Sequence, residues 1–366
     1  MRQLTPVAPR VLLVPGPAGA DRFEAPMDRL APLANGASGE IALYRDALAP
    51  NGFADRRDGF LSSLRWYARL VRFVWRGRDR IDLVHFHETP GPAVCGLLRT
   101  ARRFMPRVRF TQRIAFIPVT SGSLSRRLFA HAVVVETLDA LDRVRVHAPG
   151  IAAYRLPPPV ASDGEPPSRD EIPARLGLHP GAFHLLFDGP IERGNVLEHL
   201  ARIVPYLLLA ERRLHFHFRV RVRTPGCRAA ADAFYQRHLS AFCLQTSVHF
   251  EDESARGLWD LADALFLPYE RHAQDAEIPL AVIDAAAHGK PVFLLDRSPW
   301  ADLGPHDLRA RVTAAKDPDL GLRILDYVRD PGVIPGEVLK GHARQHFAAD
   351  VAVRKLREIA ERTAAR

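Results

Sequence analysis

Residues 260–296 constrain the fold of this chain more than any other segment. The apolar run ALFLP stops at Pro268, as a buried strand of a parallel sheet does. The segment PLAVIDAAAHG predicts a helix that begins after Pro279 and ends at Gly289, and PVFLLD predicts a second buried strand. A strand, a helix and a strand in this order are typical of a parallel sheet covered by helices.

An acidic loop precedes this predicted helix, and a further carboxylate lies inside it. The loop contains Glu270, Asp275 and Glu277, and the helix contains Asp284. A helix N-terminus at the carboxyl edge of a parallel sheet is a common nucleotide site. Asp284 can accept hydrogen bonds from both hydroxyls of a ribose. The segment therefore predicts a nucleotide site, although a generic amphipathic helix of an α/β domain also fits it.

Length and composition favour a globular protein of two domains. The chain has 366 residues, of which 47% are hydrophobic and 25% charged. No apolar run reaches the roughly 18–20 residues that span a bilayer, and the apolar stretch near the N-terminus is short for a signal peptide. The three cysteines lack the spacing of a zinc site. We therefore expect a cytoplasmic protein without a metal or a cofactor.

Strands and helices alternate through residues 1–155 and again through residues 182–345. The segment between them, residues 156–181, is rich in proline, glycine and glutamate, which is typical of a linker. Residues 346–366 predict an amphipathic C-terminal helix. We expect an α/β protein of two Rossmann-like domains, each a doubly wound parallel sheet.

The net charge of +9 comes from the N-terminal part of the chain, where arginine is abundant and lysine is absent. Residues 60–80 predict a helix in which aromatic residues alternate with arginines. The pattern suits an anionic membrane surface, and it equally suits a core helix with a solvated face. No nucleic-acid-binding motif accompanies it, so we do not expect a nucleic acid partner. The arginines are Arg65, Arg69, Arg72, Arg76, Arg78 and Arg80.

A second alternating pattern lies in the C-terminal half. His215, His217, Arg219, Arg221 and Arg223 alternate with apolar residues, which predicts a strand with one polar face. We interpret it as an edge strand beside helices.

Several motifs, in their order along the chain, resemble those of the retaining family-four glycosyltransferases. IDLVHFH resembles the D-V-V-H-x-H strand of that family, and LLFDGPIERGN resembles its phosphate loop. The segment AEIPLAVIDAAAHGKPV resembles its donor-binding segment, in which two acids flank seven residues. The resemblance implies a GT-B fold, in which two Rossmann-like domains face a central cleft. It also implies transfer of a hexose or related sugar, with retention, from a nucleotide diphosphate sugar.

The resemblance also assigns residues to the donor. Asp284 would hold the ribose, Arg193 the diphosphate, and Glu277 the sugar hydroxyls. Gly189 lies in the phosphate loop. Gly16 follows the first strand, where a glycine lets the backbone approach a phosphate or an acceptor. Because a cationic side chain and a helix N-terminus can stabilise the leaving diphosphate, no metal is implied.

The acceptor would lie against the N-terminal domain. His87 ends the strand IDLVHFH and Glu88 follows it, and both would face the acceptor. The expected catalytic residues are therefore His87, Glu88 and Glu277. The acceptor would be a glycan or a lipid-linked glycan of bacterial surface polysaccharide or glycoconjugate synthesis. The enzyme would then be cytoplasmic, with the basic helix binding the inner face of the membrane.

Three positions depart from the family pattern. Ala276 replaces the first acid of the donor segment, Pro190 replaces an arginine of the phosphate loop, and Arg113 replaces a histidine. The three departures could reflect an unusual sugar or acceptor, or a loss of activity. Two alternatives therefore stay open: a nucleotide-sugar epimerase on the same fold, and a degenerate relative that acts as a binding subunit.

Overall fold

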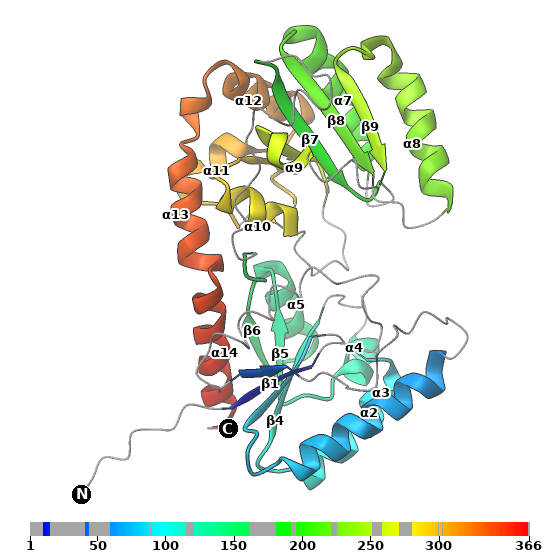
Figure 1. The fold of residues 1–366 in the computed structure, drawn as a ribbon, viewed down its shortest axis with the longest axis vertical. Helices are drawn as coiled ribbons and strands as arrows, with labels where there is room; N and C mark the ends of the chain where they lie inside the picture. The colour runs from blue at the N-terminus through cyan, green and yellow to red at the C-terminus, as the bar shows by residue number, and fades with distance from the viewer. Residues whose placement is uncertain are drawn as a thin grey trace, which may run out of the picture. The chain divides into compact units, whose positions relative to one another are not determined.

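The computed structural model describes residues 10–14, 41–43, 59–87, 90–114, 121–160, 181–191, 195–220, 225–250, 258–270, 280–298, 300–301 and 303–364. These residues divide into two compact units. The first unit is drawn from Met1–Ser162, Ala273–Ile278 and Phe347–Arg366, and the second from Asp163–His272 and Pro279–His346. Each unit is built around a six-stranded parallel sheet (Figure 1).

The sheet of the first unit has the strand order β2-β1-β3-β4-β5-β6. Strand β1 lies between β2 and β3, so the direction in which the sheet grows reverses at this point. In open α/β sheets, ligands bind at the carboxyl edge beside such a reversal. The strands are β1 Val11–Val14, β2 Ile41–Leu43, β3 Leu83–Phe86, β4 Arg109–Arg113, β5 Ala132–Val135 and β6 Ala152–Arg155.

Helices cover both faces of this sheet, which confirms a doubly wound fold (Figure 1). Val84 and Phe86 of β3 pack against α2 and α3, whereas Leu83 packs against α14. Because neighbouring residues of a strand point to opposite faces, these contacts place α14 opposite α2 and α3. The helices are α2 Gly59–Arg76, α3 Pro92–Phe104, α4 Ser121–Arg127, α5 Leu138–His147 and α14 Ala349–Ala364.

The last helix of the chain therefore belongs to the first unit. Ala352, Leu356 and Ala360 of α14 form a buried cluster with Val11 and Leu13 of β1. Their spacing of four residues places all three on one stripe of the helix. The C-terminal helix expected over residues 346–366 is present, and its apolar stripe completes the core of the N-terminal sheet.

Helix α2 is a core helix with a basic outer face. Trp66, Tyr67, Leu70 and Val74 are buried, at the spacing of one helical stripe. The arginines at positions 65, 69, 72 and 76 are exposed, as are the side chains of two aromatic residues at positions 73 and 75. The apolar stripe explains why the helix forms, and the arginines give it a basic outer face.

The sheet of the second unit has the strand order β12-β11-β10-β7-β8-β9. Numbered from its own first strand, this is the order 3-2-1-4-5-6 of dinucleotide-binding Rossmann folds. The reversal falls between β7 and β10, which pair directly. The strands are β7 Phe183–Gly189, β8 Leu214–Val220, β9 Thr246–Phe250, β10 Ala264–Leu267, β11 Val292–Leu295 and β12 Thr313–Ala314.

Helices again cover both faces. Leu186 packs against Ala281 and Ala285 of α10, whereas Phe183 contacts Tyr327 of α12 at a centroid distance of 5.7 Å. Residues 183 and 186 point to opposite faces of β7, so α10 and α12 lie on opposite faces of the sheet. The helices are α7 Val196–Ala210, α8 Pro225–His238, α9 Leu258–Leu261, α10 Leu280–Ala287, α11 His306–Val312, α12 Asp317–Arg329 and α13 Gly336–Phe347, with short 3₁₀ turns at Ser240–Phe242 and Pro331–Val333.

The strand–helix–strand segment expected at residues 260–296 is confirmed as β10, α10 and β11. Helix α10 ends as the sequence predicts, because Gly289 has a φ of +71°, a left-handed conformation that glycine adopts without strain. A side chain there would also collide, since a Cβ would lie 2.9 Å from the carbonyl oxygen of Gly336.

The interpretation of residues 214–220 as an edge strand is wrong. Strand β8 lies inside the sheet and pairs with both β7 and β9. Its polar face can be buried because the histidines bond to one another. His184 Nδ1 lies 3.0 Å from His217 Nε2, and His217 Nδ1 lies 2.8 Å from Ser247 Oγ. Burial and the neighbouring histidines hold the pKa of His217 well below its ordinary value.

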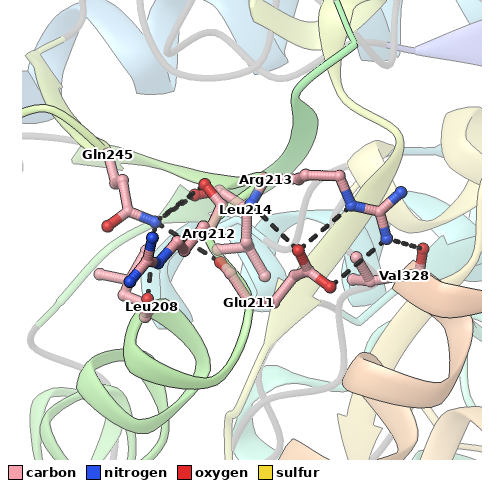
Figure 2. Close-up of polar contacts among 7 residues, drawn as sticks. All are labelled: Leu208, Glu211, Arg212, Arg213, Leu214, Gln245 and Val328. Atoms are coloured by element: carbon pink, nitrogen blue, oxygen red, sulfur yellow. Dashed lines mark hydrogen bonds and ion pairs between the residues drawn. The ribbon is translucent and has the colours of Figure 1, made fainter.

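The turn between α7 and β8 is fixed by side chains at the amino edge of the sheet (Figure 2). The Gln245 side-chain amide nitrogen lies 3.2–3.5 Å from four backbone carbonyls, among which its two N–H groups donate. Arg213 donates to the Glu211 carboxylate from Nε and Nη2, which lowers the pKa of that carboxyl. Carbonyl groups at the end of a helix lack partners within the helix, so these contacts stabilise the exit from α7. The four carbonyls belong to Leu208, Glu211, Arg212 and Leu214.

No helix in the described part of the chain is both long and apolar enough to cross a membrane. The cysteines Cys95, Cys227 and Cys243 are free thiols. Within the same described residues, no group of three or more histidine, cysteine or acidic side chains has the geometry of a metal site.

Candidate functional site

The carboxyl edge of the second sheet contains one of the expected donor residues, Gly189, at the end of β7. A Cβ at this position would lie 1.9 Å from the hydroxyl oxygen of Tyr269. That hydroxyl donates to the carbonyl of Pro190 at 3.0 Å. Glycine is therefore required here by the close approach of the chain that follows β10. The two strands at the reversal are tied together at their carboxyl ends.

A second expected donor residue, Asp284, lies one turn inside α10 and is half-buried. The backbone of the same residue accepts hydrogen bonds from the His288 amide at 2.9 Å and from His288 Nδ1 at 2.8 Å. Ala281 and Ala285 fix the helix onto the sheet. The carboxylate is thus held by a packed helix beside the strand reversal.

Several expected site residues lie outside the described residues. These are Gly16, Glu88, Arg193 and Glu277, together with the departure at Ala276. Of the residues expected to contact the donor, the structure therefore describes Gly189 and Asp284. Of the residues expected to contact the acceptor, it describes His87, in the first unit.

His87 follows β3 at the reversal of the first sheet. The residue is buried, and its amide donates to the Val14 carbonyl of β1 at 2.9 Å. Within the described residues, its Nε2 atom is buried without a hydrogen-bond partner. Burial, Arg113 and His85 together hold the pKa of His87 well below its ordinary value. His87 is therefore a neutral imidazole at pH 7, with one N–H and one lone pair.

Arg113, one of the three positions that depart from the pattern expected from sequence, forms a buried ion pair. Its Nε and Nη2 atoms lie 2.6 Å and 2.5 Å from Oε1 of Glu136. Its Nη1 atom donates to the carbonyl of His87 at 3.4 Å. Sequence reasoning did not identify Glu136, although an acid directly after the buried strand AVVV was a signal for it. The arginine at position 113 is thus paired with an acidic residue, Glu136, in this chain.

These residues surround a small cavity of about 30 Å³ at the carboxyl edge of β3, β4 and β5. His85 also lines it and bonds through Nδ1 to Thr111 Oγ1 at 2.9 Å. Burial, with a contribution from Arg113, lowers the pKa of His85 to about 4. Prolines 157–159 and α14 form the apolar side. A volume of this size holds about one water molecule or hydroxyl group, which the neutral imidazoles can bind.

Neither a protein-family model nor a curated protein sequence matches the chain. Several solved structures are similar to it. A glycosyltransferase from Rickettsia africae ESF-5 aligns over 97% of this chain and 98% of its own, at 12% identity and a TM-score of 0.67. The Anabaena protein Alr3699/HepE, in complex with UDP and glucose, aligns over 96% and 99%, at 12% identity and a TM-score of 0.67.

A plant enzyme domain has the same TM-score. The catalytic domain of starch synthase IV from Arabidopsis thaliana, bound to ADP and acarbose, aligns over 98% of this chain and all of its own, at 9% identity and a TM-score of 0.67. The similarity therefore extends along nearly the whole chain and confirms the expected GT-B fold of two Rossmann-like units. At such low identity it shows the fold alone.

Proposed function

We propose that the protein is a glycosyltransferase that moves a sugar from a nucleotide diphosphate sugar to a glycan or lipid-linked acceptor. The observation that carries this proposal is the second sheet. Its strand order is that of nucleotide-binding Rossmann folds, and Asp284 stands on the helix that follows β10 at the reversal. The similarity to a protein bound to UDP and glucose supports the same assignment.

The donor would bind at the carboxyl edge of the second sheet. Asp284 would accept hydrogen bonds from the two ribose hydroxyls, and Glu277 would contact hydroxyls of the sugar. Arg193 would bind the diphosphate, where negative charge grows as the bond to the sugar breaks. Gly16 would let the backbone approach the donor, and Gly189 would lie beside the donor at the start of the phosphate loop. Because the guanidinium stabilises the leaving group, the proposed reaction needs no metal or other cofactor.

The acceptor would bind at the carboxyl edge of the first sheet. His87 and Glu88 would face its hydroxyl, and a neutral imidazole can accept a hydrogen bond or a proton from it. The buried pair of Arg113 and Glu136 would hold the backbone of residue 87 in place. We propose retention of configuration, a hexosyl or related donor, and a role in bacterial surface polysaccharide or glycoconjugate synthesis in the cytoplasm.

A thermal-shift panel of UDP-, GDP-, ADP- and dTDP-sugars tests the donor site. We expect one nucleotide to stabilise the protein, because a ligand that binds only the folded state raises its stability. Incubation with the matching donor and a panel of glycan acceptors should then yield a glycoside. Release of free nucleotide and an isomerised sugar without an acceptor would favour the epimerase. Tight binding with no turnover would favour a binding subunit.

A further inference from the structure

A pocket of about 810 Å³ opens at the carboxyl edge of the second sheet, between α7 and α12. Four strands of the sheet contribute to its rim through the residues that follow them. Asn195 follows β7, Glu270 follows β10, Arg297 follows β11 and Lys316 follows β12. Such a volume is typical of small-molecule sites, which lie most often at this edge of an α/β sheet.

A buried histidine forms the base of the pocket. His199 Nδ1 lies 2.7 Å from Asp317 Oδ1, and its Nε2 lies 3.4 Å from Glu270 Oε1. Arg297 pairs with the same Glu270 oxygen at 2.8 Å, and Arg202 pairs with Asp317 Oδ2 at 3.3 Å. The polar groups are thus held in place by one another before any ligand binds, which reduces the entropy lost on binding.

Part of the lining is apolar and exposed. Tyr206 and Leu322 line the pocket with side chains that are 44% and 49% exposed. Gly321 of α12 lies against the ring of Tyr206, since a Cβ there would be 3.5 Å from Cδ1. Ile203 and Pro318 complete this part of the lining. Large apolar side chains left exposed in a concave site often mark a binding surface.

The pocket lies away from Asp284, the proposed ribose ligand, although Asn195 and Glu270 on its rim come from the two loops that precede and follow the proposed donor contacts. Of the described donor candidates, neither Gly189 nor Asp284 lines it. The pocket is formed by α7 and α12, whereas Asp284 belongs to α10, and α10 and α12 cover opposite faces of the sheet. A ligand in this pocket would therefore not contact Asp284.

The charges of the described lining residues indicate the class of ligand. Three cationic side chains, Arg202, Arg297 and Lys316, are balanced by three carboxylates, Glu198, Glu270 and Asp317. The carboxylates would repel a polyanion such as a nucleotide, and the cations would repel a polycation. Carboxylates accept, and guanidinium groups donate, two hydrogen bonds in a plane, which suits adjacent hydroxyls.

A sugar ring combines such hydroxyls with an apolar C–H face. Tyr206 and Leu322 offer the matching apolar surface, and the volume accommodates two or three residues of a glycan. We propose that this pocket binds a neutral oligosaccharide. The proposal goes beyond sugar transfer, because binding here requires neither a donor nor an acceptor reaction. In a glycosyltransferase, it would retain a glycan chain on the donor-binding unit.

Calorimetric titration of the full chain with maltotriose, cellotriose, chitotriose and mannotriose tests this. We expect saturable binding of at least one, weakened roughly tenfold by Tyr206→Ala and by Arg297→Ala. Both side chains are exposed, so both variants should fold. Leu209→Ala is the matched control, because Leu209 lies on the same helix, is 74% exposed and does not line the pocket.

If the proposal is correct, variants should affect the binding of the oligosaccharide and the binding of the donor independently. We expect Tyr206→Ala to leave the affinity for nucleoside diphosphates unchanged, and Asp284→Ala to leave the affinity for the oligosaccharide unchanged. The proposal is overturned if none of the four oligosaccharides binds, or if the two pocket variants bind as tightly as wild type. Competition by inorganic pyrophosphate would overturn it as well, since the pocket would then be an anion site.

Discussion

The hydroxyl group of Tyr269 occupies the space that a side chain at residue 189 would need. A Cβ at Gly189 would lie 1.9 Å from that oxygen and 3.1 Å from the Cζ atom behind it. The hydroxyl also donates to the carbonyl of Pro190 at 3.0 Å. The chain after β10 is thereby fixed against the chain after β7, at the point where the second sheet reverses its strand order.

We predict that Gly189→Ala lowers the free energy of unfolding by about 1–3 kcal/mol, because an overpacked site must shift. In a Tyr269→Phe background the loss should be smaller, since the closest atom is gone. Urea denaturation of the double-mutant cycle measures this coupling. Gly226→Ala serves as the control, because nothing lies within 4 Å of a Cβ there. Equal losses in both backgrounds would contradict the contact.

The buried pair of Arg113 and Glu136 gives a second prediction. Both side chains are less than one-tenth exposed. Arg113→Met should therefore cost about 3–5 kcal/mol of stability, because it leaves a buried carboxylate without its cation. Adding Glu136→Leu should recover most of that loss. The exposed pair of Arg145 and Asp142 is the control, where removal of one partner should cost under about 1 kcal/mol.

If Arg113→Met were as stable as wild type, the pair would contribute nothing to the fold. A double variant less stable than Arg113→Met alone would show that Glu136 contributes independently of its partner. Either result would contradict the idea that Arg113 and Glu136 stabilise the fold as a matched pair.

The strands and the helix α10 could be predicted from sequence because their signals are local. Apolar runs end at residues such as Pro268, and Gly289 ends a helix through its own backbone conformation. The prediction that β8 is an edge strand was wrong because the position of a strand in its sheet depends on residues elsewhere in the chain. An alternating pattern shows that one face is polar, but burial of that face depends on partners such as His184, on a different strand.

The pairing of distant segments could not be predicted either. Glu136 lies on a different strand from Arg113, so only the order of strands in the sheet brings them together. The pocket between α7 and α12 combines loops after four strands with exposed faces of two helices. Helix α14 is amphipathic in sequence, yet nothing in its own residues indicates that it packs on β1 and β3.

The buried histidines predict a loss of stability in acid. Burial lowers the pKa of His85 to about 4, whereas a histidine of the unfolded chain titrates near 6.5. Between these values the unfolded chain binds a proton that the folded chain does not, so the free energy of unfolding falls as the pH is lowered. The stabilisation is fully present above about pH 6.5 and is lost towards pH 4.

For His85 alone the loss reaches up to about 2 kcal/mol at pH 5. His85→Gln removes the titrating group and keeps a polar side chain near Thr111, to which His85 bonds. We expect its urea midpoint to fall less between pH 7.5 and pH 5 than that of wild type. Parallel pH profiles for the two proteins would show that His85 takes up its proton equally in both states.

Asp284→Ala should remove most of the stabilisation that a nucleoside diphosphate gives. Hydrogen bonds to a charged group contribute roughly 1.5–3 kcal/mol, so the dissociation constant should rise about tenfold or more. Calorimetry with the nucleotide identified in the thermal-shift panel measures it. Asp326→Ala is the control, because that carboxylate is exposed on α12. Unchanged affinity in a folded Asp284→Ala variant would exclude the ribose role.

Arg193→Ala separates the diphosphate contact from the nucleoside contact. Residue 193 lies outside the described part of the chain, and the prediction rests on its place in the loop after LLFDG. A guanidinium that bridges two diphosphate oxygens should matter for the diphosphate and not for the free nucleoside. We expect the affinity for the diphosphate to fall far more than that for the nucleoside. Equal losses would show that Arg193 is not a phosphate ligand.

The basic face of α2 predicts binding to anionic membranes. Arg72 and Arg76 are exposed beside Phe73 and Trp75, whose side chains are 48% and 43% exposed. Each arginine near an anionic surface contributes about 1 kcal/mol, within a Debye length of about 8–10 Å. We expect the protein to float with vesicles that contain phosphatidylserine at low salt, and to dissociate from them as salt is added.

Charge reversal separates a docking face from a merely solvated one. Arg72→Glu with Arg76→Glu should abolish flotation, since two attractions become repulsions. The control reverses Arg354 and Arg362 on α14, which are also exposed and change the net charge equally. Because the buried stripe of α2 is untouched in the first variant, both proteins should unfold at the same temperature as wild type.

If wild-type protein stays out of the vesicle fraction at low salt, the acceptor is not delivered by a membrane through this helix. Equal loss in the two charge-reversal variants would reduce the effect to net charge, without a role for the face of α2.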